Sequence, residues 1–261
     1  MTSRASTARA QADELERALR AIGRPERAVS EKRYLKSDLE FIGVDAAGMR
    51  GVVRAFLQRH GKPDHDQLVS LAEELWTLPV HERHAVAIEL LDRHRDLLEP
   101  ADLPLVERLL RDSHTWAYVD ALSVHIVGSI VERDPEALSV LDRWAADDDF
   151  WLRRSAMLAL LPPIRRGEGD FGRFARYADG MIEEREFFIR KAIGWVLREA
   201  SKSRPDLVFD WLAPRTHRIS GVSIREAVKY LPPEQREALM TAYAKRTPGD
   251  WHPLAPARHF P

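Results

Sequence analysis

The chain has 261 residues, 44% of them hydrophobic, so it is long enough to bury a substantial core and is not an intrinsically disordered chain. Its 40 Lys and Arg nearly balance 41 Asp and Glu, so net charge predicts neither a nucleic-acid partner nor an acidic one, and any basic surface has to be local. The absence of cysteine excludes disulfides and thiolate metal sites.

Targeting and membrane signals are absent from the sequence. The first residues lack the apolar stretch of a secretory signal, and no run of 18 apolar residues occurs. The richness in Arg and Ala is typical of a GC-rich bacterial genome. We therefore expect a soluble cytoplasmic protein.

Apolar residues recur at helical spacing along the chain, whereas the alternation typical of strands is nearly absent. The predicted apolar stripes comprise Leu15, Leu19 and Ile22, then Leu68, Leu71 and Leu75, then Val86, Leu90 and Leu91. Pro135 and Pro205 stand where a proline fits the first helical position, so each is expected to open a new helix pair.

Four segments share one pattern, an arginine followed by a variable residue, a small residue and apolar positions at helical spacing. These segments begin at Arg83, Arg153, Arg190 and Arg225. Their spacing, two helices per unit, predicts an all-α fold of HEAT-like repeats stacked into a curved α-α solenoid with a concave groove.

The predicted domain organisation is a single repeat domain over residues 1–246. Within it, 1–65 are expected to form a helical N-terminal cap and 66–246 the repeats. Residues 247–261 are a Pro-rich tail, which we expect to be poorly ordered.

The arginine series has two interpretations. In a structural ladder, an arginine early in the second helix bonds an aspartate near the preceding turn, and Asp148 stands in this relation to Arg153. A binding role is favoured by further cations, Arg154, Lys191 and Lys229, next to these positions or one turn away. From 153 to 204 the sequence has twelve Lys and Arg against seven Asp and Glu, which suits a phosphate backbone.

One carboxylate interrupts the cationic series. Counting 37 residues on from Arg83 leads to Asp120, and Arg153 follows 33 residues later. An acid among cations that face DNA would lower affinity, so it needs a reason. Either Asp120 serves chemistry, or it is a buried acid that pairs with Arg154 for packing.

Six strings, in order, resemble the AlkD-like DNA alkylation repair proteins over about residues 30 to 235. They are YLKSDLEFIGV from 34, the LW and HERHAVAIELL segment over 75–91, HTWAYVDAL from 114, DDDFWLRRSAML from 147, EFFIRKAIGWVLREASKSRPD from 186 and SIREAVKYL from 223. The resemblance implies a HEAT-like fold with a concave DNA-binding groove. It also implies a monofunctional DNA glycosylase of base excision repair that removes positively charged N7- and N3-alkylpurines.

The resemblance assigns catalytic positions to Asp120, Trp116, Trp195 and Arg154. Glycosidic cleavage passes through an oxocarbenium-like sugar, which a fixed carboxylate such as Asp120 stabilises while it aligns water. Trp116 lies one helical turn before it, and indole faces attract a cationic base. Arg154 is expected to clamp a phosphate bidentately.

The expected partner is double-stranded DNA containing alkylated bases, bound by a monomer without cofactor, metal or membrane and associated with the nucleoid when bound. The predicted DNA-binding residues are Arg153, Arg190, Lys191, Arg225, Lys229, Arg83 and Lys36. The chain has no asparagine and four glutamines, so we expect recognition through phosphates, shape and lesion charge, with no enclosed pocket for an extruded base.

Several features favour plainer interpretations. The alternative function is a non-catalytic HEAT scaffold that binds DNA or an acidic protein.

Trp76, Trp144, Trp151 and Trp211 are expected in the core. The GEGDFG string at 167–172 is expected to be a turn, since no strand precedes it, and the HERH string at 81–84 lacks zinc-ligand spacing, so its histidines are expected to be surface or ladder residues.

Overall fold

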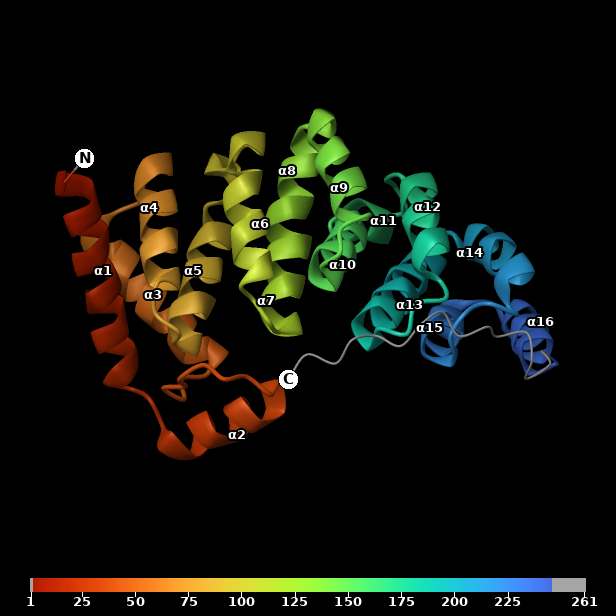
Figure 1. Cartoon of the computed structure of the whole chain (residues 1–261), viewed down its shortest axis with the longest axis horizontal. Helices are drawn as coiled ribbons and strands as arrows, with labels where there is room; N and C mark the ends of the chain where they lie inside the picture. Colours follow the sequence, from red (N-terminus) through yellow and green to blue (C-terminus); the bar gives the residue numbers. More distant parts are fainter. Residues whose placement is uncertain (1, 246–261) are drawn as a thin grey trace. The chain divides into compact units, whose positions relative to one another are not determined.

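The computed structural model describes the backbone of residues 2–245 and the side chains of residues 6–245 (Figure 1). Within this part of the chain every regular element is a helix, apart from one isolated parallel bridge between Glu40 and Val80. The predicted all-α fold is confirmed. The predicted Pro-rich tail, 247–261, lies outside the described residues.

The chain divides into two compact units, 1–134 and 135–261. The expectation of a single repeat domain therefore remains a prediction, and each unit is described by itself.

The first unit runs from α1 to α8. Its α-helices are α1 (Thr2–Arg20), α2 (Pro25–Leu35), α3 (Ala46–His60), α4 (His65–Trp76), α5 (His81–Arg93), α6 (Leu103–Arg111), α7 (Trp116–Ala121) and α8 (Gly128–Arg133). Between α7 and α8 lies the π-helix η3 (Leu122–Val127), and short 3₁₀ turns occupy η1 (Arg95–Leu97) and η2 (Pro100–Asp102).

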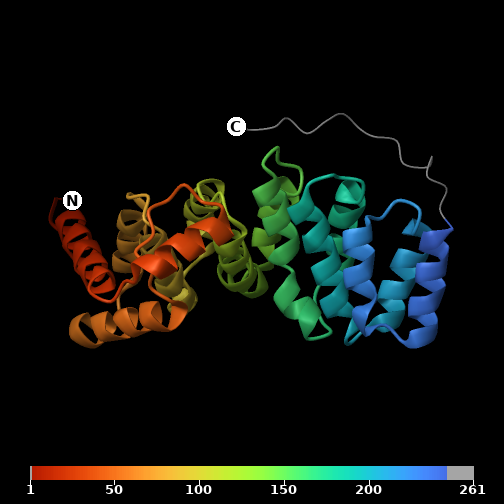
Figure 2. The same cartoon turned by 90° about the horizontal axis from the view of Figure 1, so that it is seen from below.

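The second unit continues the series of helix pairs (Figure 2). Its α-helices are α9 (Leu138–Trp144), α10 (Phe150–Leu158), α11 (Leu161–Arg165), α12 (Phe171–Met181), α13 (Phe187–Ser201), α14 (Pro205–Leu212), α15 (Gly221–Ala227) and α16 (Pro233–Ala244). Its 3₁₀ turns are η4 (Pro135–Ala137), η5 (Ala213–Arg215) and η6 (Val228–Tyr230).

Helix pairs form because each helix has an apolar stripe that it cannot bury alone. On α4, Leu68, Leu71 and Leu75 recur every three or four residues, are at most 3% exposed, and belong to a helix that packs against α5. Asp64 begins α4 with a capping box that includes Gln67. The same arrangement joins α10 to α13 and α13 to α15 in the second unit.

The sequence stripes are confirmed except at one residue. All eight other predicted residues are buried, but Ile22 is 47% exposed. The physical reason is that α1 ends at Arg20, so the helical period no longer governs where Ile22 points. The predicted helix start at Pro205 is confirmed, and Pro135 opens the 3₁₀ turn that leads into α9.

Gly194 permits the close contact between α13 and α15. A Cβ at this position would lie 2.9 Å from the Cβ of Glu226 and 3.0 Å from the Cα and carbonyl oxygen of Ser223. Backbone atoms have little room to move, so the glycine sets how near α15 approaches.

We predict that Gly194→Ala lowers the free energy of unfolding by about 1–3 kcal/mol, because the added methyl group overpacks a rigid contact. Gly180 on α12 is the matched control, since a Cβ there meets nothing within 4 Å. Gly180→Ala should leave stability unchanged or raise it slightly through helix propensity. Urea unfolding of both variants checks this, and equal stabilities would contradict the packing argument.

Candidate functional site

Trp116 and Asp120 lie one turn apart on α7, and both side chains are half-buried. Residues four apart on a helix have Cβ atoms roughly 6 Å from one another, so the indole and the carboxylate share one face. His114 precedes the helix with a φ of 45°, a left-handed conformation that turns the chain sharply after α6. The helix therefore begins at Trp116.

The helix that carries Asp120 changes type directly after it. Residues Leu122–Val127 form a π-helix, and the backbone dihedral angles at both junctions are helical, so α7, η3 and α8 are one continuous helix. Leu122, Ile126 and Val127 are fully buried. π-Segments inside α-helices frequently occur at functional sites. Here the π-segment fixes the Asp120 end of the helix to the core.

Tyr34 contacts Trp116, which sequence reasoning did not predict. Its ring meets the indole edge-on, with centroids 6.2 Å apart, although Tyr34 itself is 70% exposed. It lies at the end of α2, a helix with no buried residue. The available signal was its position as the first residue of the YLKSDLEFIGV string.

Tyr118 of α7 belongs to a buried aromatic cluster on the core side of this helix. Tyr118, 2% exposed, places its hydroxyl 2.6 Å from Nδ1 of His81, whose ring stacks on Phe41. Burial raises the pKa of Tyr118 and lowers the pKa of His81, so the phenol stays protonated and the imidazole stays neutral, and the histidine tautomer decides which of them donates. His84, also buried, stacks on Trp76 with centroids 4.1 Å apart.

This cluster corrects one expectation from the sequence. His81 and His84 are 7% and 4% exposed and are core residues, where surface or ladder positions were expected. The reason is that α5 packs against α3, α4 and α7, so even its first turn is enclosed. Trp144, Trp151 and Trp211 are core residues as predicted, whereas Trp76 is half-buried.

Glu82 ties the connection after α2 to α5. Its carboxylate is fully buried and accepts hydrogen bonds from the backbone N–H groups of Ile42, Gly43 and Val44, at 2.7–3.1 Å. These three hydrogen bonds hold the connection against the first turn of α5. Sequence reasoning missed this role, because a glutamate in the HERH string reads as a polar surface residue.

Three arginines of the repeated pattern bond main-chain carbonyls at the end of the preceding helix or in the connection that leads into their own helix. Arg83 donates to Glu74 and Leu75, Arg153 to Asp147 and Asp148, and Arg190 to Glu184. Arg83 and Arg153 also pair with Glu16 and Glu184. These contacts correspond to the ladder interpretation, although Asp148 accepts through its carbonyl oxygen and not its carboxylate.

The contacts correct the predicted DNA-binding role of Arg83. Its side chain is 1% exposed and its donors are directed into the protein, so it does not present a cation to solvent. Arg153, with 19% of its side chain exposed, and the half-buried Arg190 also use their guanidinium groups internally. Lys36, Lys191, Arg225 and Lys229 are exposed, and their DNA-binding role remains a prediction.

The second unit contains Arg154 on α10 and Trp195 on α13. Arg154 is 4% exposed; one Nη donates to the carbonyl of Phe188 at 2.5 Å, and the guanidinium lies over the ring of the same residue. Its predicted bidentate phosphate clamp therefore does not match the geometry of this structure, where the cation is directed into the protein. Trp195 is half-buried.

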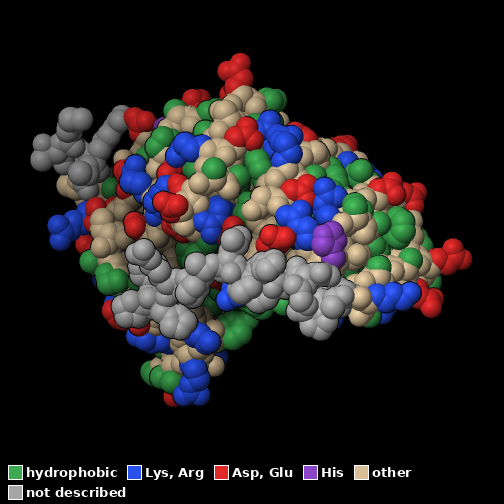
Figure 3. Space-filling view, turned by 45° about the vertical axis from the view of Figure 1, so that its right-hand side comes forward, with side chains coloured by type: hydrophobic (Ala, Val, Ile, Leu, Met, Phe, Trp, Pro, Cys, Tyr) green, Lys and Arg blue, Asp and Glu red, His purple; other side chains and the backbone are tan. Residues whose placement is uncertain are grey.

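Charges of both signs are interspersed on the face shown in Figure 3, with no extended field of one sign. The first four residues of GEGDFG, 167–170, lie in the predicted turn between α11 and α12, with left-handed Gly167 and Gly169, and its last two residues begin α12. Over residues 2–245, no helix combines the length and apolarity needed to cross a bilayer. In the same range, no group of three or more His, Asp or Glu side chains is placed to hold a metal ion.

Stacked helix pairs, with a half-buried aromatic residue and a half-buried carboxylate one turn apart, define an all-helical repeat protein with a polar site. The family model for DNA alkylation repair enzymes matches residues 15–231. The chain belongs to this family. No curated protein matches it in sequence.

Solved structures show the same fold. A protein described as a predicted DNA alkylation repair enzyme from Enterococcus faecalis is 25% identical, with a TM-score of 0.70 over 81% of this chain and 97% of that one. AlkD2 and smu.31, both from Streptococcus mutans, are each 19% identical with a TM-score of 0.55. The AlkD2 alignment covers 79% of this chain and 98% of that one, and the smu.31 alignment 71% and 94%. The fold and family expected from the resemblance are confirmed.

The buried His84 predicts how the free energy of unfolding depends on pH. Burial lowers the pKa of His84 to about 4, whereas the unfolded chain titrates near 6.5. Between these values the unfolded state binds the proton more readily, so folding loses stability as the pH falls from 6.5 to 4, by up to about 3 kcal/mol from His84 alone. Unfolding free energies should drop over this range, and His84→Gln should flatten the drop.

His65 is a control of opposite sign. Hydrogen bonds that His65 donates to Asp102 and Asp66 raise the pKa of His65, so its contribution to stability is present at low pH and is lost as the pH rises through this raised pKa. His65→Gln should therefore lower the unfolding free energy by a constant amount below pH 6.5, leave the acid loss between pH 6.5 and 4 unchanged, and lose its effect as the pH rises. Identical pH profiles for wild type and His84→Gln would contradict the assignment.

Proposed function

We propose that the protein is a monofunctional DNA glycosylase that hydrolyses the N-glycosidic bond of N7- and N3-alkylated purines, with Asp120 as the catalytic carboxylate. The observation that carries the proposal is Asp120 one turn from Trp116 on α7, in a member of the DNA alkylation repair enzyme family. We place this activity on nucleoid DNA in the bacterial cytoplasm, with the protein acting as a monomer.

The charge of the lesion makes one carboxylate sufficient. A purine alkylated at N7 or N3 already carries positive charge and leaves without a strong general acid. Positive charge then develops on the sugar, where a fixed carboxylate stabilises it and orients the attacking water. Asp120 suits this role because it is half-buried, which strengthens its electrostatic effect while leaving a path for DNA.

Trp116 is proposed to hold the cationic base or the adjoining sugar. An indole face attracts a cation by about 0.5–2 kcal/mol. Tyr34 meets the indole edge-on and restrains its orientation. Trp195 on α13 is proposed to supply a second aromatic surface.

The exposed cations are proposed to bind phosphates, which fixes the strand without reading sequence. This set is Lys36, Lys191, Arg225 and Lys229. Arg154 is proposed to act as a positioning residue. Its hydrogen bond to the Phe188 carbonyl links α10 to α13, the helix that carries Trp195.

The experiment compares release of 7-methylguanine from methylated duplex DNA by wild type, Asp120→Asn and Asp112→Asn. Asp112 is an exposed carboxylate at the end of α6 and serves as the matched control. Asp120→Asn should lose at least about 100-fold in single-turnover rate, because it removes preorganised charge stabilisation. Its affinity for DNA should stay or increase, since a repulsive charge is gone.

Equal release by wild type and Asp120→Asn, or no release by wild type at high enzyme concentration, would reject the catalytic assignment. DNA binding without any release would support a non-catalytic scaffold instead.

Aromatic variants test base recognition separately. Trp116→Ala should slow release of 7-methylguanine by roughly 3- to 30-fold, the range expected for a lost cation–π contact, whereas Trp116→Phe should retain most of the rate. The same pair of substitutions at Trp195 tests the second surface. If alanine and phenylalanine variants behave alike, the indole face has no recognition role at that position.

A further inference from the structure

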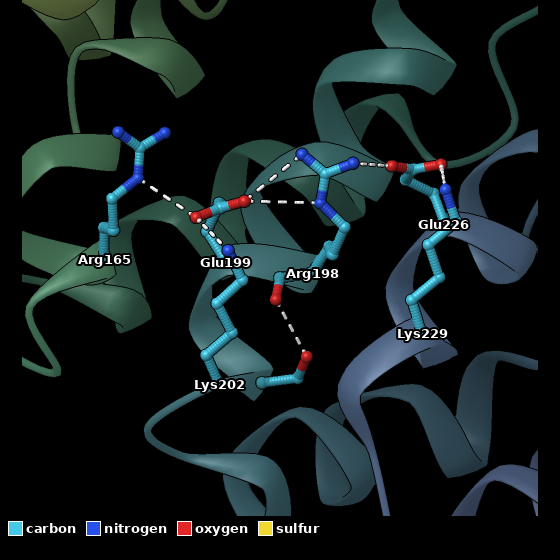
Figure 4. A network of polar contacts seen from close by, with 7 residues as sticks. Arg165, Arg198, Glu199, Lys202, Glu226 and Lys229 are labelled. Carbon is cyan, nitrogen blue, oxygen red and sulfur yellow. Dashed lines mark hydrogen bonds and ion pairs between the residues drawn. The ribbon is translucent and has the colours of Figure 1, made fainter.

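Arg198 and Glu199 end the GWVLRE string, and the proposed chemistry gives neither of them a role. In the structure they form the centre of a polar network that joins α11, α13, α15 and η6 of the second unit (Figure 4). The network consists of Arg165, Arg198, Glu199, Lys202, Glu226 and Lys229.

Glu199 is the buried carboxylate at the centre of the network. It is 4% exposed and accepts hydrogen bonds from Arg165 at 3.0 Å and from Lys202 at 2.9 Å, with the guanidinium of Arg198 at 3.2–3.3 Å. Burial opposes ionisation, but the hydrogen bond from Lys202 and the neighbouring cations outweigh it and lower the pKa of Glu199. The carboxylate is therefore charged and holds its three cations in place.

Glu226 on α15 extends the network. It pairs with Arg198, and its second oxygen accepts from Lys229 at 2.7 Å. Against burial, the hydrogen bond from Lys229 and the charges of Arg198 and Lys191 lower its pKa as well. Four cations thus share two carboxylates, an excess of two positive charges.

The cations lie on the outer side of this arrangement. The side chains of Arg165, Lys202 and Lys229 are 47%, 40% and 53% exposed, against 5% and 12% for Glu199 and Glu226. Arg165 uses Nε for Glu199, and Figure 4 shows its two terminal nitrogens directed away from that carboxylate. These nitrogens have the planar fork that matches two phosphate oxygens.

The network shares one face of α13 with Trp195. Lys191, Trp195, Arg198 and Lys202 are spaced by four, three and four residues, which places them within one narrow stripe of a helix. From Trp195 to Lys202 is seven residues, or about 10 Å along the axis. Any DNA strand that reaches Trp195 therefore passes close to the network.

We propose that Arg165 and Lys202, preorganised by Glu199, form a binding site for the phosphodiester backbone of DNA. This proposal rests on the proposed function for its partner, but not on the catalytic role of Asp120. Cations already fixed by a buried carboxylate lose little side-chain entropy on binding, so each contact contributes more to the binding free energy. The two carboxylates also reduce the net positive charge of the network from four to two.

The test measures the affinity of the whole protein for undamaged duplex DNA by fluorescence anisotropy at several salt concentrations. The double variant Arg165→Gln/Lys202→Gln removes exposed cations and spares Glu199. Its affinity should fall by about ten-fold, and the slope of log K against log salt by about 2, one for each lost phosphate contact. Thermal unfolding verifies that the variant is folded.

Arg218→Gln is the matched control, because Arg218 is an exposed arginine of the same unit that pairs with a single exposed glutamate, Glu183. It should leave affinity and salt slope unchanged. A folded double variant with the affinity and slope of this control overturns the proposal and leaves the network a structural link between repeats.

Failure of the two proposals is distinguishable. If wild type binds duplex and releases 7-methylguanine while the double variant binds like the control, only the phosphate site is rejected. If wild type binds duplex but Asp120→Asn releases as much base as wild type, only the catalytic assignment is rejected. If wild type binds no duplex at all, both fall together.

Discussion

Arginine donation to main-chain carbonyls holds the helix pairs of this protein together. A helix leaves its last carbonyls without intrahelical partners, and the chain that follows adds more. Arg83 bonds two carbonyls at the end of α4, and Arg153 bonds two in the connection before α10. Because a guanidinium has five donors in a fixed plane, one side chain closes a connection and still pairs with a carboxylate of a neighbouring helix.

This use of arginine explains how far the sequence could predict the site. The helices themselves follow from the spacing of Leu68, Leu71 and Leu75, because burial of an apolar stripe is a property of the helix alone. Whether a cation is available to bind a ligand, in contrast, does not depend on its own helix alone. Arg83 and Arg225 share a sequence pattern, yet the first is buried and the second exposed, because the surrounding elements decide whether the guanidinium is enclosed.

The same limit applies to Glu82, His81 and Tyr34. Each depends on contacts between segments about 40 or more residues apart, such as Glu82 with Gly43 or Tyr34 with Trp116, and local periodicity carries no information about these. Asp120 was detectable because it breaks a count of repeats and matches a family string. Its place one turn after Trp116 also follows from the sequence, whereas its half-buried position comes only from the fold. Sequence thus predicts the fold and the family better than it predicts which cations are available.

The π-helix after α7 bears on how a protein of this fold changes its activity. A π-turn differs from an α-turn by one additional residue, and each residue of an α-helix turns the side chains by about 100°. Deletion of one residue within Leu122–Val127 would restore an uninterrupted α-helix while α8 stays in the core. Trp116 and Asp120 would then rotate together, away from their present direction. A single codon loss therefore offers an evolutionary route from a chemically competent relative to one that keeps the fold without the reaction.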